Sequence, residues 1–180
     1  MNRVQDLINI NERKGLPRTY RFNPLIRWFT ILLALAVIVY SIWVILYKIS
    51  SDSSTFYKIV PFIILFLAFN TLLKNLLSVN SIRLSKQNIQ FRYLVKPAVS
   101  ILLDSIIKIS LHDSRPKGIK FHYKEDDQDK NFLLILAFPR ILEIVNSIAE
   151  LCPDIEYDEF IKNIIITDIE KKVAQKQKVE

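Results

Sequence analysis

The sequence predicts a membrane α-helical hairpin followed by a small α+β domain, an antiparallel β barrel or sandwich capped by a C-terminal helix. Three observations predict this fold class: two long apolar segments, an alternating apolar and polar pattern after them, and an amphipathic segment after that pattern. The expected parts are a basic arm (1–27), a transmembrane hairpin (28–77), a β-rich domain (80–152) and an amphipathic helix with a tail (153–180).

The charge distribution excludes one broad function class. The 180-residue chain has a formal net charge of +7, and residues 1–27 hold six Lys/Arg against two Asp/Glu. Residues 80–180 are almost neutral, with sixteen basic and fifteen acidic residues. A nucleic-acid-binding domain needs a basic face on its folded part, so no nucleic-acid partner is expected. A single Cys and two Gly also exclude a disulfide framework and a glycine-rich chain.

The first apolar segment has the length of a membrane span. Twenty consecutive residues, 28–47, carry no formal charge, and twenty helical residues cover about 30 Å, the thickness of the hydrocarbon core. The run is too long for the apolar region of a cleaved signal peptide, and a buried soluble helix would show a polar face. Aromatic and basic residues mark its ends, as at membrane interfaces. These expected anchors are Arg27, Trp28, Trp43, Tyr47 and Lys48.

The second apolar segment runs from Phe56 to Leu77. Its strictly uncharged part, residues 59–73, has fifteen residues, which is short for a span. Lys58 and Lys74 lengthen it, because a lysine stem lies along apolar surface while its ammonium group reaches the interface. Both lysines therefore join the expected membrane anchors.

The short polar stretch between the two spans predicts an antiparallel hairpin, so both termini lie on one side of the membrane. The basic residues between Arg13 and Arg27 place that side in the cytoplasm by the positive-inside rule. The expected location is a multi-pass integral membrane protein of the bacterial inner membrane, with an organellar membrane as the alternative.

Alternation predicts the strands of the β-rich domain. A β-hairpin is expected over 81–93, with Ile82 and Leu84 on the buried face and a turn at residues 86–88. Later strands are expected at 100–103, at 107–112 with Ile107, Ile109 and Leu111 buried, and at 119–124 with Ile119, Phe121 and Tyr123 buried. The continuous apolar run 131–138 predicts a central strand, and Pro139 opens an amphipathic helix that ends at Cys152-Pro153.

Three stretches carry a family resemblance: NSIRLSK at residues 80–86, NIQFR at 88–92 and ILLDSIIKI at 101–109. With them, residues 25–152 resemble the bacterial membrane proteins that pair a two-helix transmembrane hairpin with a bacterial PH-like domain. The resemblance implies a PH-like fold, in which a C-terminal helix caps a small antiparallel barrel. A second resemblance, in architecture alone, is to the photosystem I assembly factors of chloroplasts and cyanobacteria.

No motif in the sequence predicts catalysis. The chain lacks nucleophile-elbow, P-loop, dinucleotide-binding and zinc-protease motifs. His112 and His122 are expected as exposed strand residues without a third metal ligand, and Cys152 as a packing residue at a helix end. The acidic stretch 125–129 lacks the Gly and Glu of a calcium loop. The sequence therefore predicts no catalytic, cofactor or metal site, no small-molecule substrate, and a protein that is not an enzyme.

Two sets of residues are candidate binding sites. An apolar stripe at helical spacing near the C-terminus either packs on its own domain or docks on a partner, and we expect a partner. Its members are Phe160, Ile161, Ile164, Ile165 and Ile169. Lys86 and Arg92 flank the first β-hairpin and are candidates for binding lipid headgroups.

The expected function is that of a non-catalytic, membrane-anchored binding module. It acts as a scaffold, an assembly factor or an accessory subunit of a membrane protein complex. The expected partners are the lipid bilayer and either a membrane protein or a second copy of the chain. A lipid-headgroup sensor and a component of an envelope or export system are the alternatives.

Overall fold

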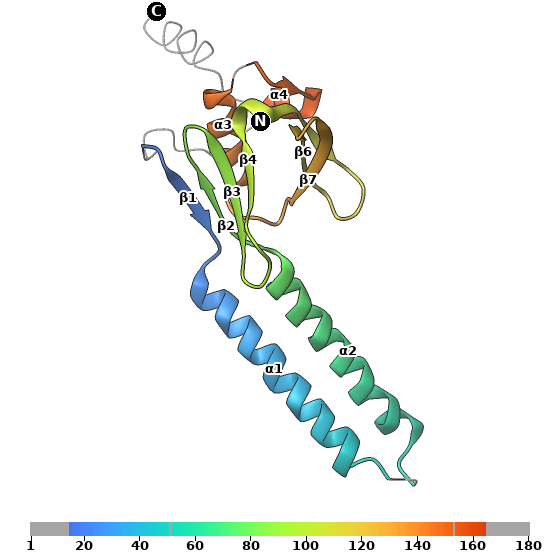
Figure 1. Ribbon diagram of the computed structural model, residues 1–180. Coiled ribbons are helices and arrows are strands. Elements are labelled where there is room, and N and C mark those ends of the chain that lie inside the picture. Colours follow the sequence, from blue (N-terminus) through green and yellow to red (C-terminus); the bar gives the residue numbers. More distant parts are fainter. Residues whose placement is uncertain (1–14, 51, 153, 165–180) are drawn as a thin grey trace, which may run out of the picture. The chain divides into compact units, whose positions relative to one another are not determined.

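The computed structural model describes residues 15–50, 52–152 and 154–164, of which Ile164 is described by its backbone alone (Figure 1). The chain divides into two compact units. The helical unit comprises Arg21–Asn80 together with Arg92–Pro97. The β unit comprises the residues up to Tyr20, Ser81–Phe91 and the residues from Ala98 onward.

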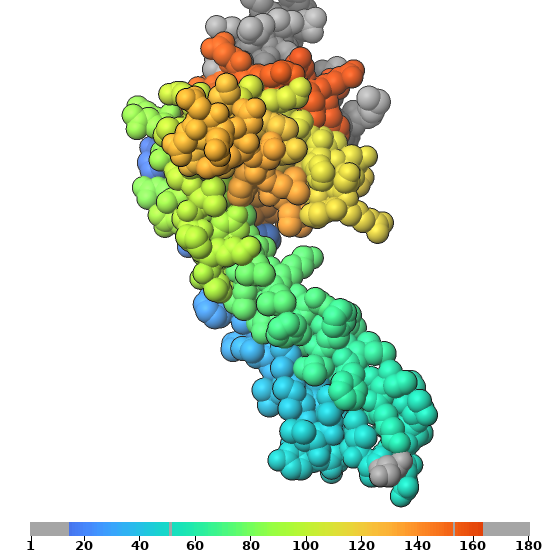
Figure 2. Space-filling view, turned by 45° about the vertical axis from the view of Figure 1, so that its right-hand side comes forward, coloured from blue at the N-terminus to red at the C-terminus, as the bar shows by residue number. Residues whose placement is uncertain are grey.

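The helical unit is an antiparallel pair of long helices, α1 (Pro24–Tyr47) and α2 (Thr55–Leu77), which lie side by side in both views (Figures 1 and 2). Asn23 caps α1 by accepting a hydrogen bond from the Leu25 N–H at 3.0 Å. Both helices are long and apolar enough to cross a membrane, and little of either is buried. The two predicted segments are thus confirmed as candidate membrane spans.

Small side chains, together with Ile31 and Pro61, line the contact between α1 and α2. Ile31, Ala34 and Ser41 are buried on α1, and Pro61 and Ala68 are buried on α2. These positions recur at intervals of three and four residues, or seven, so each set forms one stripe along its helix. Small residues let two helix backbones approach closely, which is how helices associate inside membranes. Many of the other large apolar side chains of both helices are exposed.

The β unit is built on two sheets. The first sheet has the order β1 (Arg18–Arg21), β2 (Val79–Leu84), β3 (Asn88–Tyr93), β4 (Val99–Leu102). The second has the order β7 (Gln128–Ile135), β6 (Gly118–Glu125), β5 (Ile106–His112), β8 (Glu156–Tyr157). A short 3-10 turn, Leu103–Ser105, joins the sheets, and the helices α3 (Ile141–Leu151) and α4 (Glu159–Ile164) follow β7 and β8.

An aromatic cluster from both sheets forms the centre of the core. Phe91 of β3 stacks on Phe132 of β7 with ring centroids 4.0 Å apart, and Phe121 of β6 meets Phe91 edge-on at 5.8 Å. The α3 stripe adds Ile144 and Ile148, both fully buried. The predicted inward faces of β2 and β6 are confirmed, since their expected core residues are all buried.

Several expectations are wrong in detail. The sheets are open: among the described residues, no strand pairing closes them into a barrel. The apolar strand β7 lies at an edge and not in the centre. The tight turn at Asp126 and Asp127, both with positive φ, pairs it with β6, and no other described strand pairs with its other side. A register shift in β5 buries Ile106 and turns Ile107 outward, 46% exposed.

Two further differences concern an additional strand and the start of a helix. Residues Arg18–Arg21, expected in a basic arm, form the edge strand β1 with Tyr20 buried. Helix α3 begins at Ile141 after Arg140, which has φ 57°, so Pro139 lies in the preceding turn and does not open the helix.

Candidate functional site

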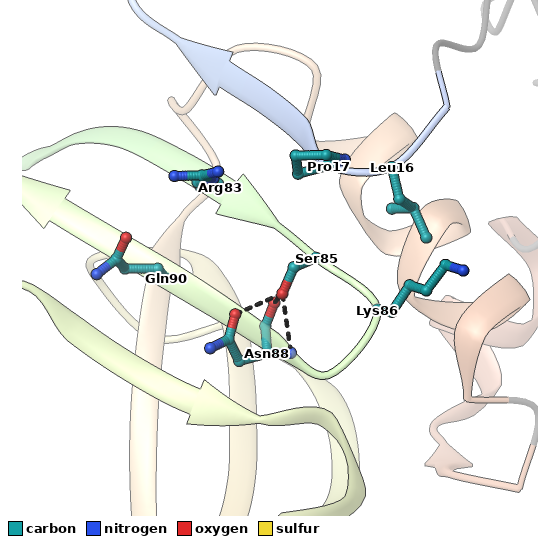
Figure 3. A pocket seen from close by; sticks show the side chains of 7 residues that line it. All are labelled: Leu16, Pro17, Arg83, Ser85, Lys86, Asn88 and Gln90. Carbon is teal, nitrogen blue, oxygen red and sulfur yellow. Dashed lines mark hydrogen bonds between the residues drawn. The ribbon is translucent and has the colours of Figure 1, made fainter.

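A groove lies on the face of the first sheet that points away from the core (Figure 3). Ile82, Leu84, Ile89 and Phe91 of β2 and β3 are buried, so the residues between them project outward. The groove has a volume of about 460 Å³. Its lining residues are Leu16, Pro17, Arg83, Ser85, Lys86, Asn88 and Gln90.

The chemistry of the groove favours an anion. Arg83 and Lys86 are exposed and supply two positive charges, and no carboxylate is among the lining residues. The Ser85 hydroxyl lies 2.9 Å from the Asn88 carbonyl oxygen and 2.5 Å from its Oδ1, and the Asn88 N–H donates to Ser85 Oγ at 3.2 Å. This network occupies the amide oxygen of Asn88 and leaves its Nδ2 as a donor. Cations and N–H donors together match phosphate or carboxylate oxygens.

The two residues expected to bind headgroups do not line the same groove. Lys86 lines the groove, whereas Arg92 is not among its lining residues and belongs to the helical unit. Sequence reasoning missed Arg83, Ser85 and Asn88. Their outward positions beside the turn at Lys86 could have identified them, because they follow the same alternation that predicted the buried face.

Arg27, expected as an interfacial anchor, is 6% exposed and binds the end of α2. Its guanidinium donates to the carbonyl oxygens of Ser78 at 3.1 Å and Val79 at 3.2 Å, to that of Asn75, and to Ser78 Oγ at 3.1 Å. The last carbonyls of a helix have no partners within it and carry negative partial charge. Arg27 therefore ties the first turn of α1 to the last turn of α2.

The other expected anchors face outward. Trp28, Trp43 and Tyr47 are 57%, 44% and 74% exposed, and Lys48 and Lys74 are exposed. The Lys48 ammonium lies 5.2 Å from the centre of the Trp43 ring. Lys58 is half-buried. This arrangement leaves the aromatic rings near the helix ends available to an interface.

The C-terminal stripe is divided between the core and the surface. Ile161 is fully buried within the β unit, and Phe160 is 50% exposed. The Asp158 carboxylate accepts hydrogen bonds from the Ile161 N–H at 2.7 Å and from the Leu111 N–H, so it holds α4 against β5. The side chain of Ile164 and all of Ile165 and Ile169 lie outside the described residues.

Cys152 and His122 have different surroundings in the described part of the chain. A second hollow of about 390 Å³ contains Cys152 beside Asp104 and Asp154. Burial, and then the charge of Asp104, raises the pKa of the Cys152 thiol, which disfavours the nucleophilic thiolate. His122 Nε2 lies 3.3 Å from Ser110 Oγ. Within the described residues, no group of three or more His, Cys, Asp or Glu is placed to hold a metal ion.

Comparison of the chain with protein-family models, curated proteins and solved structures finds no match. The features from which a function can be inferred are therefore the two candidate membrane spans, the basic groove and the contacts of α4.

Proposed function

We propose that this protein is a membrane-anchored, non-catalytic binding module that serves as a scaffold, assembly factor or accessory subunit of a membrane protein complex. One observation carries the proposal: each membrane-length helix is joined to a strand of the first sheet by a very short connection, α1 to the preceding β1 and α2 to the following β2. Only Phe22 and Asn23 separate β1 from α1, and only Ser78 separates α2 from β2. Because the connections are so short, β1 and β2 begin or end within a few residues of the expected membrane interface. A module that binds a membrane protein partner needs its binding domain close to that interface.

The basic arm and the antiparallel helix pair support a topology with both termini in the cytoplasm. Basic residues precede α1, and the connection between the helices holds Asp52 as its charged residue between Lys48 and Lys58. The positive-inside rule then assigns the β unit to the cytoplasmic side. The membrane is that of a bacterial cell, with an organellar membrane as the alternative.

The finer fold assignment, a PH-like domain, is also a proposal. It is supported by two small sheets whose consecutive strands pair as hairpins, followed by the amphipathic helix α3 packed on the core. An experimental structure tests it directly. A PH-like domain requires α3 to cap one open end of the two packed sheets.

The test of the proposed function is purification of the full chain from native membranes in a mild detergent. The expected result is a complex with one partner in fixed stoichiometry, measured by native mass spectrometry. Phe121→Asp is the matched control, because it disrupts the β unit and leaves α1 and α2 in place; it should lose the partner. A chain that purifies alone as a monomer contradicts the proposal.

A second function, headgroup binding, is favoured by one feature: the groove with Arg83 and Lys86 and no lining carboxylate. The test compares anionic phosphatidylglycerol with phosphatidylcholine retained by the purified full chain. Arg83→Glu with Lys86→Glu should weaken the preference for the anionic lipid, whereas Lys124→Glu should leave it unchanged. Equal retention of both lipids by the wild-type chain excludes this function.

A further inference from the structure

The loop between β3 and β4 returns to the base of the helices. Strand β2 leaves α2 at Val79, and β3 runs back beside it after a turn closed by the Ser85 N–H to Asn88 carbonyl hydrogen bond at 2.9 Å. If the pairing of Ser85 with Asn88 is continued residue by residue along the hairpin of β2 and β3, Leu94 lies opposite Val79. Residues Arg92–Pro97 accordingly belong to the helical unit, and their tip lies beside the end of α2 (Figures 1 and 2).

The tip of this loop reaches the level at which the helices enter the membrane. Lys74 and the carbonyl groups bound by Arg27 mark that level at the last turn of α2. Strand β3 ends at Tyr93, and Val95 lies midway between Phe91 and Val99, which pair with each other, so Val95 is at the tip of the loop. Val95 and Lys96 therefore lie beyond the level of Val79, towards the last turn of α2.

The loop has the composition of a segment that lies in a membrane interface. Its sequence, RYLVKP, places an apolar centre between two cations and contains no acidic residue. Val95 is 65% exposed, and Lys96 is exposed beside it. An apolar side chain at the tip gains by entering the acyl boundary, and flanking cations are attracted to anionic headgroups.

We propose that Arg92–Pro97 forms a third contact with the bilayer, in addition to α1 and α2. Val95 enters the headgroup layer of the leaflet in which α1 begins and α2 ends, and Lys96 binds anionic headgroups there. The inference rests on the proposed membrane anchoring. It assigns Arg92 to this contact and leaves Lys86 to the separate groove of the β unit.

The deciding experiment measures depth in the membrane for spin labels on the full chain in nanodiscs of phosphatidylglycerol and phosphatidylcholine. Single cysteines replace Val95, Leu102 or Val39 in a Cys152→Ser background. Leu102 is the matched control, because it is an apolar residue of the β unit with a similar exposed fraction, 60%. Val39, exposed midway along α1, is the reference for immersion.

The depth of each label is given by the ratio of its collision rate with oxygen to its collision rate with a water-soluble nickel chelate. We expect this ratio to be several-fold higher for the label at Val95 than for that at Leu102. The label at Val39 should give the highest ratio. If Val95 matches Leu102 while Val39 is immersed, the inference is overturned and membrane anchoring stands. If Val39 is as accessible to nickel as Leu102, the anchoring itself fails. Immersion of Leu102 together with Val95 also overturns a contact specific to this loop.

The label at Val95 also tests whether the charge of Lys96 contributes to the contact with anionic headgroups. Lys96→Glu should lower the immersion of the label at Val95, as should nanodiscs of phosphatidylcholine alone, whereas Lys124→Glu should leave it unchanged. An immersion that responds to neither change overturns the role given to anionic headgroups.

Discussion

At the residue scale, Arg27 gives the helical unit its most specific contact. Its planar guanidinium reaches several carbonyl oxygens at the end of α2 at once and lies 5.5 Å from the centre of the Phe22 ring. A lysine at the same position presents one compact ammonium group and cannot reproduce that fork. The contact therefore depends on the shape of the side chain as well as on its charge.

Arg27→Lys should lower the free energy of unfolding by about 1–3 kcal/mol, because carbonyl groups at the end of α2 lose their donors. Thermal unfolding of the full chain in mild detergent measures the loss. Arg21→Lys, at an exposed position, is the control and should change little. Equal effects of the two substitutions would show that Arg27 acts only as a charge.

The surroundings of His122 predict a pH-dependent stability of the β unit. Burial lowers the pKa of His122, and the nearby charges of Lys120 and Lys108 lower it further, while Glu156 opposes them. The folded state thus prefers the neutral imidazole. The neutral imidazole of His122 therefore contributes its full stabilisation at pH values above the pKa of a histidine in the unfolded chain, about 6.5. That stabilisation is lost as the pH falls through and below this value.

We expect the melting temperature of the β unit to decrease between pH 7.5 and pH 5, and His122→Gln to reduce that decrease. Gln87→Asn, at an exposed position without a titratable group, is the control and should keep the wild-type slope. A slope unaffected by His122→Gln would assign the pH dependence to other groups.

At the element scale, α4 shows how a stripe that looks like a docking surface can serve the core. The parallel pairing of β8 with β5, Ile109 beside Tyr157, brings α4 against the second sheet and covers Ile161. Half-exposed Phe160 remains on the outer side. A partner that docks on the described part of the stripe therefore meets Phe160 and not Ile161.

Ile161→Asp should cost at least about 3 kcal/mol of stability, because it buries a charge without a partner. Phe160→Asp should change stability by less than about 0.5 kcal/mol, since surface substitutions are nearly silent. Chemical denaturation of the full chain in detergent separates them. If Phe160→Asp preserves the fold but weakens the partner complex, the exposed side of α4 is a binding surface; comparable destabilisation would mean that its faces are assigned wrongly.

The elements that sequence could predict are those with a strong pattern. The uncharged run from Trp28 to Tyr47 fixes α1, and strict alternation fixes the inward side of β6. Strand β1 was missed because Tyr20 is its one buried residue. The bulge in β5 was missed because an inserted residue reverses which side chains face inward, and alternation alone does not reveal where that happens.

The candidate groove was only partly predictable for a related reason. Lys86 stands out as a cation in a turn, but the groove also needs Pro17 of the N-terminal segment beside Arg83 of β2. More than sixty residues and both helices lie between those two positions in the chain. Local periodicity carries no signal for such a long-range pairing, so the site becomes visible only once the sheet is assembled.

At the scale of the whole molecule, the two long helices lie in the chain between the edge strand β1 and β2, the strand beside it in the first sheet. An antiparallel hairpin returns the chain to its starting end, so β1 and β2 can pair once both helices are in place. Tyr20 on β1 is 4% exposed and its hydroxyl lies 3.1 Å from Ser147 Oγ on α3, to which Arg18 donates at 2.7 Å. The β unit is therefore discontinuous in sequence, and residues 80–152 do not contain all of it.

A soluble fragment of residues 80–164 should consequently be much less stable than the same fragment with residues 15–22 joined to its N-terminus by a short flexible linker. The missing strand removes the buried Tyr20 ring and the donors to Ser147. Burial of a large side chain contributes about 1.5–3 kcal/mol and each hydrogen bond about 0.5–1.5 kcal/mol. Urea unfolding followed by circular dichroism should show a difference of at least about 2 kcal/mol, and Tyr20→Ser in the linked fragment should remove most of it. Equal stability of the two fragments would mean that β1 is an accessory edge, and that the β unit folds without the segment preceding α1.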